Sequence, residues 1–240
     1  IFFSQFTGAE LVADKWNLSR EDLDQFAMES HQKAAHATES KYFDKEILPV
    51  EGKNAEGIND LVMADEGIRF DASLDKLAGL KPVTEGGVIT AGNASQITDG
   101  AAAVVICNDA GLKKIQSNPR AEIVSISVVG DDPVFMLTGP IPASKKALET
   151  ANLSIDDMDL YEVNEAFAPV PLAWADDLKA DKSKLNVNGG AMALGHPLGA
   201  TGAKLMTTLL HEMERRESIY GLQAICEGGG TANATIIKRL

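Results

Sequence analysis

The stretch LYEVNEAFAPVPLAWADDL, residues 160–178, decides the fold class. Its first part, residues 160–163, predicts a short strand, and residues 165–178 predict the helix that follows it. Toward the C-terminus, residues 199–216 predict a long helix and residues 218–226 a second strand. Strands that alternate with helices in this way indicate a layered α/β domain.

The segments on either side extend this pattern. Small and β-branched residues at 101–106 and 121–129 predict strands buried on both faces, as in a sheet covered by helices. Residues 142–153 predict a helix. Residues 231–237 predict a final strand, which follows a wide turn at Gly228–Gly230.

The first part of the chain combines helices with an irregular segment. Thr7 precedes Glu10 by three residues and Ser19 precedes Asp22 in the same way, which is the spacing of a capping box and predicts two helix starts. Residues 47–84 are interrupted by glycines and prolines. We therefore expect this segment to be irregular and partly exposed.

The charge balance argues against one class of function. The chain has 240 residues, with 22 Lys and Arg against 35 Asp and Glu, and a formal net charge of −13. A protein whose main task is to bind nucleic acid normally presents net positive charge or a dense basic face, so we expect no nucleic-acid partner. With 45% hydrophobic residues, the composition is that of an ordinary globular protein.

The cysteine count and the hydropathy exclude further classes of protein. Cys107 and Cys226 are too few for a disulfide framework or a four-cysteine zinc site, and we expect no metal. No apolar stretch approaches the ~18 to 20 residues of a membrane span, so we expect a cytoplasmic protein. The chain begins with Ile1 and not with Met, from which we expect a piece to be missing from the front.

The first segment that carries chemistry is Val163-Asn164-Glu165-Ala166-Phe167, where a predicted strand ends and a helix begins. An Asn at such a junction is commonly the N-cap of the helix. Alternatively, its carboxamide is fixed at the end of the strand and orients a water molecule or a substrate oxygen. Residue type alone leaves both interpretations open.

The second segment runs from Asn186-Val-Asn-Gly-Gly190 to Gly195-His196-Pro197 and on to Gly202. Glycines at this density permit positive φ and a close approach of the backbone to a ligand, and the first N–H groups of the following helix attract negative charge. His196 lies between Gly195 and Pro197 in a loop and not on an apolar helix face. A structural and a catalytic role are therefore equally open.

The third segment is Cys226-Glu227-Gly228-Gly229-Gly230. A cysteine that closes an apolar strand is usually inert core, which is what we expect of Cys107 after Val104-Val105-Ile106. Glycines follow Cys226, so we expect its sulfur and the nearby N–H groups to have room to face a ligand. Its thiol is then expected to act as an acid or base near a pKa of about 8.5, or lower beside a His or a helix end.

In this order, the three segments resemble the C-terminal half of the thiolase family, the CoA-dependent acyltransferases that cleave or form 3-oxoacyl-CoA. The family's Asn-Glu-Ala-Phe, Gly-His-Pro and Cys-x-Gly-Gly-Gly segments match residues 164–167, 195–197 and 226–230. Upstream, residues 90–95 look like the family's segment beside the pantetheine of CoA, and residues 30–34 are similar to its lid helix. The resemblance covers essentially the whole chain.

The resemblance implies a fold and a domain division. The fold would be the thiolase-like layered α-β-α-β-α arrangement, of which this chain holds the C-terminal domain, loop-domain helices and the last part of the N-terminal domain. We expect a loop (lid) domain segment at residues 1–90, the final strand and helix of the N-terminal domain at 91–117, and the C-terminal domain at 118–240. The full-length protein is expected to be a homo-oligomer, either a dimer or a tetramer.

The resemblance also implies catalytic roles. His196 would activate the nucleophilic thiol and donate into an oxyanion hole, in which Asn164 would hold a water molecule. Cys226 would be the acid and base that moves a proton, and the N–H of Gly228 would help to form a second oxyanion hole. No prosthetic group is implied, because coenzyme A and acyl-CoA enter as substrates.

Further positions match residues that bind substrate or CoA in the family. An arginine near the phosphates of CoA makes physical sense in an otherwise acidic chain, but Arg69 is equally compatible with a solvated side chain on an irregular loop. The positions are Ser95, Ala91, Arg69, Ala166 and Phe167.

The family's acyl-accepting cysteine lies upstream in a Cys-Ser-Gly-like turn at a helix start, and no such segment occurs here. Cys107 follows a predicted buried strand without a Gly-rich turn, so we reject it as that nucleophile. We expect an acyltransferase whose nucleophilic cysteine lies on a missing N-terminal segment, and this chain alone to be inactive. The alternative is a non-catalytic thiolase-like protein that binds acyl-CoA or a partner. A ketoacyl synthase is disfavoured, because that related group has a second His where this chain has Asn164.

Overall fold

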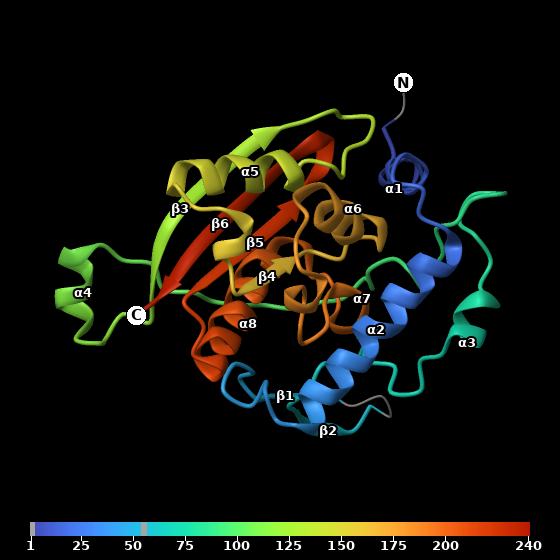
Figure 1. Cartoon of the computed structure of the whole chain (residues 1–240). Coiled ribbons are helices and arrows are strands. Elements are labelled where there is room, and N and C mark those ends of the chain that lie inside the picture. Colours follow the sequence, from blue (N-terminus) through green and yellow to red (C-terminus); the bar gives the residue numbers. More distant parts are fainter. Residues whose placement is uncertain (1–2, 54–56) are drawn as a thin grey trace.

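The structure is a computed structural model that describes residues 3–53 and 57–240 (Figure 1). Its main feature is a four-stranded mixed sheet in the order β3-β6-β5-β4. The strand β6 (Thr231–Arg239) lies antiparallel to both β3 (Ala121–Gly130) and β5 (Tyr220–Cys226), and β4 (Leu160–Val163) lies parallel to β5. The parallel pair requires a crossover, and the α-helical segment between β4 and β5 supplies it.

Helices lie on both faces of this sheet, although one face of β3 is left uncovered. The helix α5 (Pro140–Ala151) lies across β3 and β6, and α6 (Pro169–Leu178) packs beside α5 (Figure 1). The opposite face of β4 and β5 is covered by α8 (Thr201–Arg216), whose buried Leu209 and Met213 join Leu160 and Ile237 in an apolar cluster. The prediction of a layered α/β domain is therefore confirmed.

The N-terminal region packs against the crossover segment. The helix α1 (Gln5–Lys15) contacts α6, and the long α2 (Arg20–Glu39) contacts the short helices α3 (Leu74–Ala78) and α7 (Ala191–Leu194) (Figure 1). Two further strands, β1 (Val50–Lys53) and β2 (Asn59–Val62), form an antiparallel pair inside the segment that was expected to be irregular. The helix α4 (Asp109–Ile115) has no buried residue.

Four single-turn 3-10 helices also lie in the part of the chain that the structure describes. They are η1 (Ile155–Asp157), η2 (Lys182–Lys184), η3 (Leu198–Ala200) and η4 (Gly228–Gly230). The third leads directly into α8, so the predicted helix at 199–216 is a 3-10 turn followed by an α-helix. The fourth is the wide turn between β5 and β6.

One predicted helix start is confirmed and two are displaced. Ser19 and Asp22 form the expected capping box, in which Asp22 N–H donates to Ser19 Oγ (3.2 Å) and Ser19 N–H donates to Asp22 Oδ2 (2.8 Å). Thr7 lies inside α1, which begins after Ser4. The helix α6 begins at Pro169 and not at residue 165, because proline suits the first turn of a helix and no interior position.

Two predictions of doubly buried strands are wrong. Residues 101–106 form no strand and are exposed, because no part of the chain that the structure describes pairs with them. Cys107 is consequently exposed and is not inert core. In β3, Ser125 and Ser127 face α5, whereas Ile126 and Val128 on the other face are 57% and 65% exposed, because α8 does not reach this edge of the sheet.

Candidate functional site

The site lies at the carboxyl ends of the parallel strands β4 and β5. Asn164 follows β4 directly, and its N–H donates to the carbonyl of Ala224 in β5 (3.0 Å), so it continues the ladder by one residue. Cys226 is the last residue of β5. The two side chains therefore leave the sheet at the same edge, where α/β proteins commonly bind ligands.

Asn164 is not a helix N-cap, because α6 begins five residues later. Its side chain is 1% exposed and its Nδ2 lies 3.4 Å from Nε2 of His196. Its Oδ1 is buried and has no hydrogen-bond partner among residues 3–53 and 57–240. A buried carbonyl oxygen without a partner is costly, so the oxygen is available to a ligand or a water molecule.

Hydrogen bonds hold His196 at its backbone and at its ring. Its backbone N–H donates to the carbonyl of Gln96 (3.2 Å), and its Nδ1 lies 2.6 Å from Oγ1 of Thr201. The Thr201 hydroxyl donates to the carbonyl of Pro197 (3.2 Å), so toward the ring it acts as an acceptor. This network assigns the proton of the neutral ring to Nδ1 and leaves the Nε2 lone pair facing Asn164.

The environment keeps His196 neutral. Burial lowers the pKa of the imidazole, and the positive charge of Lys204 lowers it further. A neutral ring with a free Nε2 lone pair can accept a proton. The structure thus gives this histidine the protonation state of a general base.

The pKa of the Cys226 thiol differs from the predicted value. It is 7% exposed, and burial raises its pKa to about 12. The predicted pKa of about 8.5 or lower is therefore wrong, because burial disfavours the thiolate and the charge of Glu227 adds to this effect. The thiol keeps its proton at neutral pH and can begin a reaction only as an acid.

Gly228 lies beside Cys226 in the exposed 3-10 turn η4. Its carbonyl accepts a hydrogen bond from Oγ1 of Thr231 (3.0 Å), which fixes the orientation of the turn. No atom lies within 4 Å of the position that a Cβ would take at this residue. The backbone here is therefore open to a ligand.

Three of the five expected substrate-binding positions, Ser95, Ala166 and Phe167, lie on two segments that contact each other. Ser95 N–H donates to the carbonyl of Ala166 (3.0 Å), and Ala94 pairs with Phe167 in an isolated β-bridge, so two segments far apart in the sequence lie side by side. Ala166 and Phe167 are buried, whereas Ala91 is exposed.

Arg69 lies on a different segment from the other expected substrate-binding positions. Its side chain is exposed, and its backbone N–H donates to Nδ1 of the buried His31 on α2 (3.0 Å). The segment is tied to the others through Gln96, whose Nε2 donates to the carbonyl of Gly67 (2.8 Å). The predicted phosphate contact of Arg69 stays a prediction.

Sequence reasoning missed Glu165, which organises the region behind the site. This buried carboxylate accepts hydrogen bonds from Ser30 Oγ (2.7 Å), Asn186 Nδ2 (2.9 Å) and the N–H of Met192 (3.1 Å). Burial raises its pKa. The detectable signal was a charged residue inside the otherwise apolar run that follows β4.

Two glycines allow this carboxylate to approach the backbone. A Cβ at Gly190 would lie 2.3 Å from the carboxyl carbon of Glu165. Gly189 has a φ of 78° and packs against the carbonyl of Ser30 on α2. The glycine-rich segment therefore serves packing between the crossover loop and α2.

The chain belongs to the thiolase family. The family model described as the thiolase C-terminal domain matches residues 117–239, and the thiolase N-terminal domain model matches residues 5–110. Solved structures with a TM-score above 0.9 confirm the fold: the acetyl-CoA acetyltransferase of Bacillus anthracis has a TM-score of 0.94 at 41% identity, with 99% of this chain and 60% of that chain covered. The predicted division into residues 1–90, 91–117 and 118–240 stays a prediction.

Named relatives are similar over nearly all of this chain. The steroid 3-ketoacyl-CoA thiolase FadA6 of Mycobacterium tuberculosis is 54% identical over 237 residues, which cover 99% of this chain and 57% of that protein. The acetyl-CoA acetyltransferase of Paracoccus denitrificans is 46% identical, with 97% of this chain and 60% of that protein covered. The chain therefore spans about 60% of the length of these relatives.

One of the similar solved structures contains coenzyme A. It is the human mitochondrial 3-ketoacyl-CoA thiolase in complex with CoA, which has a TM-score of 0.90 and 43% identity and covers 98% of this chain and 58% of that chain. In the described part of the present chain, no group of three or more His, Cys, Asp or Glu residues is placed to hold a metal. No helix in that part is long and apolar enough to cross a membrane.

Proposed function

We propose that this chain forms the proton-transfer half of a CoA-dependent acyltransferase that cleaves 3-oxoacyl-CoA by thiolysis or condenses acyl-CoA with acetyl-CoA. The observation that carries the proposal is the 3.4 Å contact between Asn164 and the Nε2 of His196, at the sheet edge where Cys226 ends β5. The relatives named as thiolases and acetyltransferases support the reaction class.

The proposed mechanism divides the proton transfers between two residues. His196 takes the proton of an attacking thiol at Nε2, and the resulting Nε2–H donates to the oxygen on which negative charge develops. The orphaned Oδ1 of Asn164 holds the water molecule that donates to the same oxygen. The ring keeps its orientation because Nδ1 is fixed by Thr201.

Cys226 acts at the second carbon centre. In the cleavage direction, the carbon–carbon bond of the 3-oxoacyl group breaks, and the electron pair left on the departing acetyl-CoA carbon takes the proton of the Cys226 thiol. The Cys226 thiolate then takes the proton of the incoming CoA thiol, whose sulfur attacks the acyl group held on the nucleophile. The bond between the acyl carbon and the nucleophile's sulfur breaks, and this sulfur takes back the proton that His196 received. A thiol whose pKa is raised to about 12 suits this role, because it holds its proton until a strongly basic carbon forms.

The acyl-accepting nucleophile is proposed to lie outside this chain, on an N-terminal segment. Cys226 is buried and protonated, and Cys107 is exposed next to the exposed helix α4. We also propose that the protein is a cytoplasmic homo-oligomer and that acyl-CoA binds along the segments that hold Ser95 and Phe167. The support for this binding region is the pairing of these segments.

Mass spectrometry after incubation with acetyl-CoA tests the proposal. The chain is compared with a form extended at its N-terminus to the length of its relatives. We expect an acetyl adduct on a cysteine of the extension and none on Cys107 or Cys226. An adduct on Cys107 or Cys226 in the extended form, or no adduct on any cysteine, would overturn the placement of the nucleophile.

A non-catalytic acyl-CoA-binding protein is the second candidate. The observation in its favour is that neither cysteine of this chain is placed as a nucleophile. Isothermal titration with CoA separates the two candidates when combined with the adduct measurement. Binding of CoA without an adduct on the extended form would favour the second candidate.

A further inference from the structure

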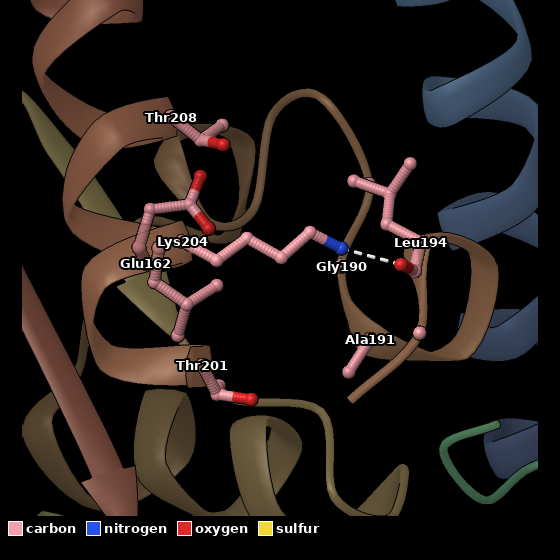
Figure 2. A pocket seen from close by; sticks show the side chains of 10 residues that line it. Glu162, Gly190, Ala191, Leu194, Thr201, Lys204 and Thr208 are labelled. Atoms are coloured by element: carbon pink, nitrogen blue, oxygen red, sulfur yellow. Dashed lines mark hydrogen bonds between the residues drawn. The ribbon is translucent and has the colours of Figure 1, made fainter. Parts of the chain in front are cut away.

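Hydrogen bonds from α8 and to Gln96 help to fix the loop that carries His196, and two of them involve His196 itself. The ring is held by Thr201, and the backbone N–H is held by the carbonyl of Gln96. A third contact lies upstream, where Nζ of Lys204 donates to the carbonyl of Leu194. Figure 2 shows the Lys204 side chain extending from α8 across to this carbonyl.

Lys204 and Thr201 both belong to the first turn of α8. The first turn of α8 therefore contacts both the carbonyl of Leu194, just before Gly195, and the ring of His196. Between the two contacts lies Gly195, which has a φ of 80° and whose Cβ position would be 2.5 Å from the side chain of Thr98. The Leu194–Gly195 peptide is bonded at both of its polar groups, because its N–H donates to the carbonyl of Ala191 (3.0 Å) while its carbonyl accepts from Lys204.

Opposing effects act on the charge of Lys204: burial lowers its pKa, and the nearby carboxyl groups partly offset this. Its side chain is 23% exposed and lines a small cavity with Glu162, Gly190, Leu194 and Thr201 (Figure 2). Asp65 Oδ1 lies 3.8 Å from Nζ, and the carboxyl groups of Glu46 and Glu162 also act on its charge. The ammonium group therefore lies between acidic side chains on one side and a carbonyl on the other.

We propose that Lys204 is a positioning residue, which fixes the Leu194–Gly195 peptide and thereby the place and the electrostatic environment of the His196 ring. The catalytic consequence rests on the proposed function, whereas the placement of His196 does not. The ring and the ammonium group are coupled through space, because the charge of Lys204 disfavours a second charge on the imidazole. Lys204 touches no reacting atom and acts on His196 through the loop and through its charge.

NMR titration of the histidine rings in the 240-residue chain tests the placement without any assay of activity. The ring signals of His196 are assigned by comparison with His196→Gln. In Lys204→Met we expect the titration midpoint of His196 to rise and the amide signals of Gly195 and His196 to shift. Lys204→Arg keeps a cationic donor and is expected to restore both toward the wild-type values.

The matched control is Lys184→Met. Nζ of Lys184 also donates to a backbone carbonyl, that of Met158 (2.8 Å), at the other end of β4. This variant loses a contact of the same kind but is expected to leave the His196 titration unchanged. If Lys184→Met moves His196 as far as Lys204→Met does, the proposal is overturned.

Two other outcomes also overturn it. The first is a folded Lys204→Met chain with unchanged His196 titration and unchanged Gly195 and His196 amides. The second is that both Lys204→Met and Lys204→Gln fail to fold while Lys204→Arg folds, because the ammonium would then be needed for the fold and not for the loop.

Kinetic measurements on the N-terminally extended form test the effect of Lys204 on catalysis. In Lys204→Met we expect kcat for thiolysis to fall about 10-fold to 100-fold with little change in KM, because a displaced catalytic group costs rate more than binding. We also expect the acidic limb of the pH profile to move to higher pH. If the wild-type form shows no thiolysis, the proposed function fails while the NMR result still decides the role of Lys204.

Discussion

The Nδ1 atom of His196 lies 2.6 Å from the Oγ1 atom of Thr201, and the same hydroxyl donates to the carbonyl of Pro197. A single hydroxyl thus determines which ring nitrogen carries the proton. The consequence for catalysis is that the base function of His196 depends on a residue five positions later in the chain.

Replacement of Thr201 should change the tautomer of His196. In Thr201→Val the Nδ1–H loses its acceptor, so we expect a mixture of tautomers and a loss of about 1 to 3 kcal/mol in the free energy of unfolding. Thr201→Ser keeps the hydroxyl and serves as the control. Nitrogen chemical shifts of the ring report the tautomer, and a Thr201→Val protein that keeps the Nδ1–H form would contradict the assignment.

Gly190 should not accept a side chain. In Gly190→Ala the methyl group would collide with the carboxyl group of Glu165, which is fixed by three hydrogen bonds. We expect a loss of about 1 to 3 kcal/mol in the free energy of unfolding, measured by chemical denaturation. The control is Gly199→Ala, where no atom lies within 4 Å of the new methyl group. Equal stability of the two variants would show that Glu165 can move.

The stability of the chain should depend on pH through Glu46. Burial raises the pKa of this carboxyl to about 7, while Thr208 donates to its Oε1 (3.3 Å) and His211 Nδ1 lies 3.5 Å from its Oε2. The folded state therefore holds the proton more tightly than the unfolded state. Stability from this group is present at pH 4 and is lost as the pH rises to 7.

The variant Glu46→Gln isolates this effect. It is neutral at every pH, so we expect the decline between about pH 4.5 and 7, on the order of 3 kcal/mol, to become smaller. Glu39→Gln removes an exposed carboxyl of α2 and is the control. Chemical denaturation across this pH range provides the measurement, and parallel profiles for wild type and Glu46→Gln would contradict the raised pKa.

The two cysteines should react at very different rates. Cys107 is exposed, whereas a pKa of about 12 leaves only about one part in ten thousand of Cys226 as thiolate at pH 8. We expect iodoacetamide to label Cys107 in the folded chain and to label both cysteines after denaturation. Cys107→Ser should therefore abolish fast labelling, and rapid modification of Cys226 in this variant would show that its thiol is accessible.

Much of the site could be predicted from the sequence because its residues lie in short segments. Asn164, His196 and Cys226 each stand beside glycines or at the end of a predicted strand, and β4 begins and ends where the residue pattern predicted. The family resemblance added the expected order of these segments. The 3.4 Å contact between Asn164 and His196 required the structure.

Other features could not be predicted because they depend on distant partners. Residues 101–106 have the composition of a buried strand, but a strand forms only where another strand pairs with it. The raised pKa of Cys226 results from burial under neighbours that the local sequence does not name. Lys204 and Glu165 act through residues 10 and 135 positions away.

The hydrogen bonds around Glu165 also bear on the order of folding. Ser30 is 135 residues from Glu165 and 160 residues from Gly190, and it is bonded to both. Contacts at such separation form late, because closing the long loop between them costs conformational entropy. We therefore expect the environment of His196 to mature after the sheet and helices in refolding experiments, so that recovery of secondary structure precedes recovery of ligand binding.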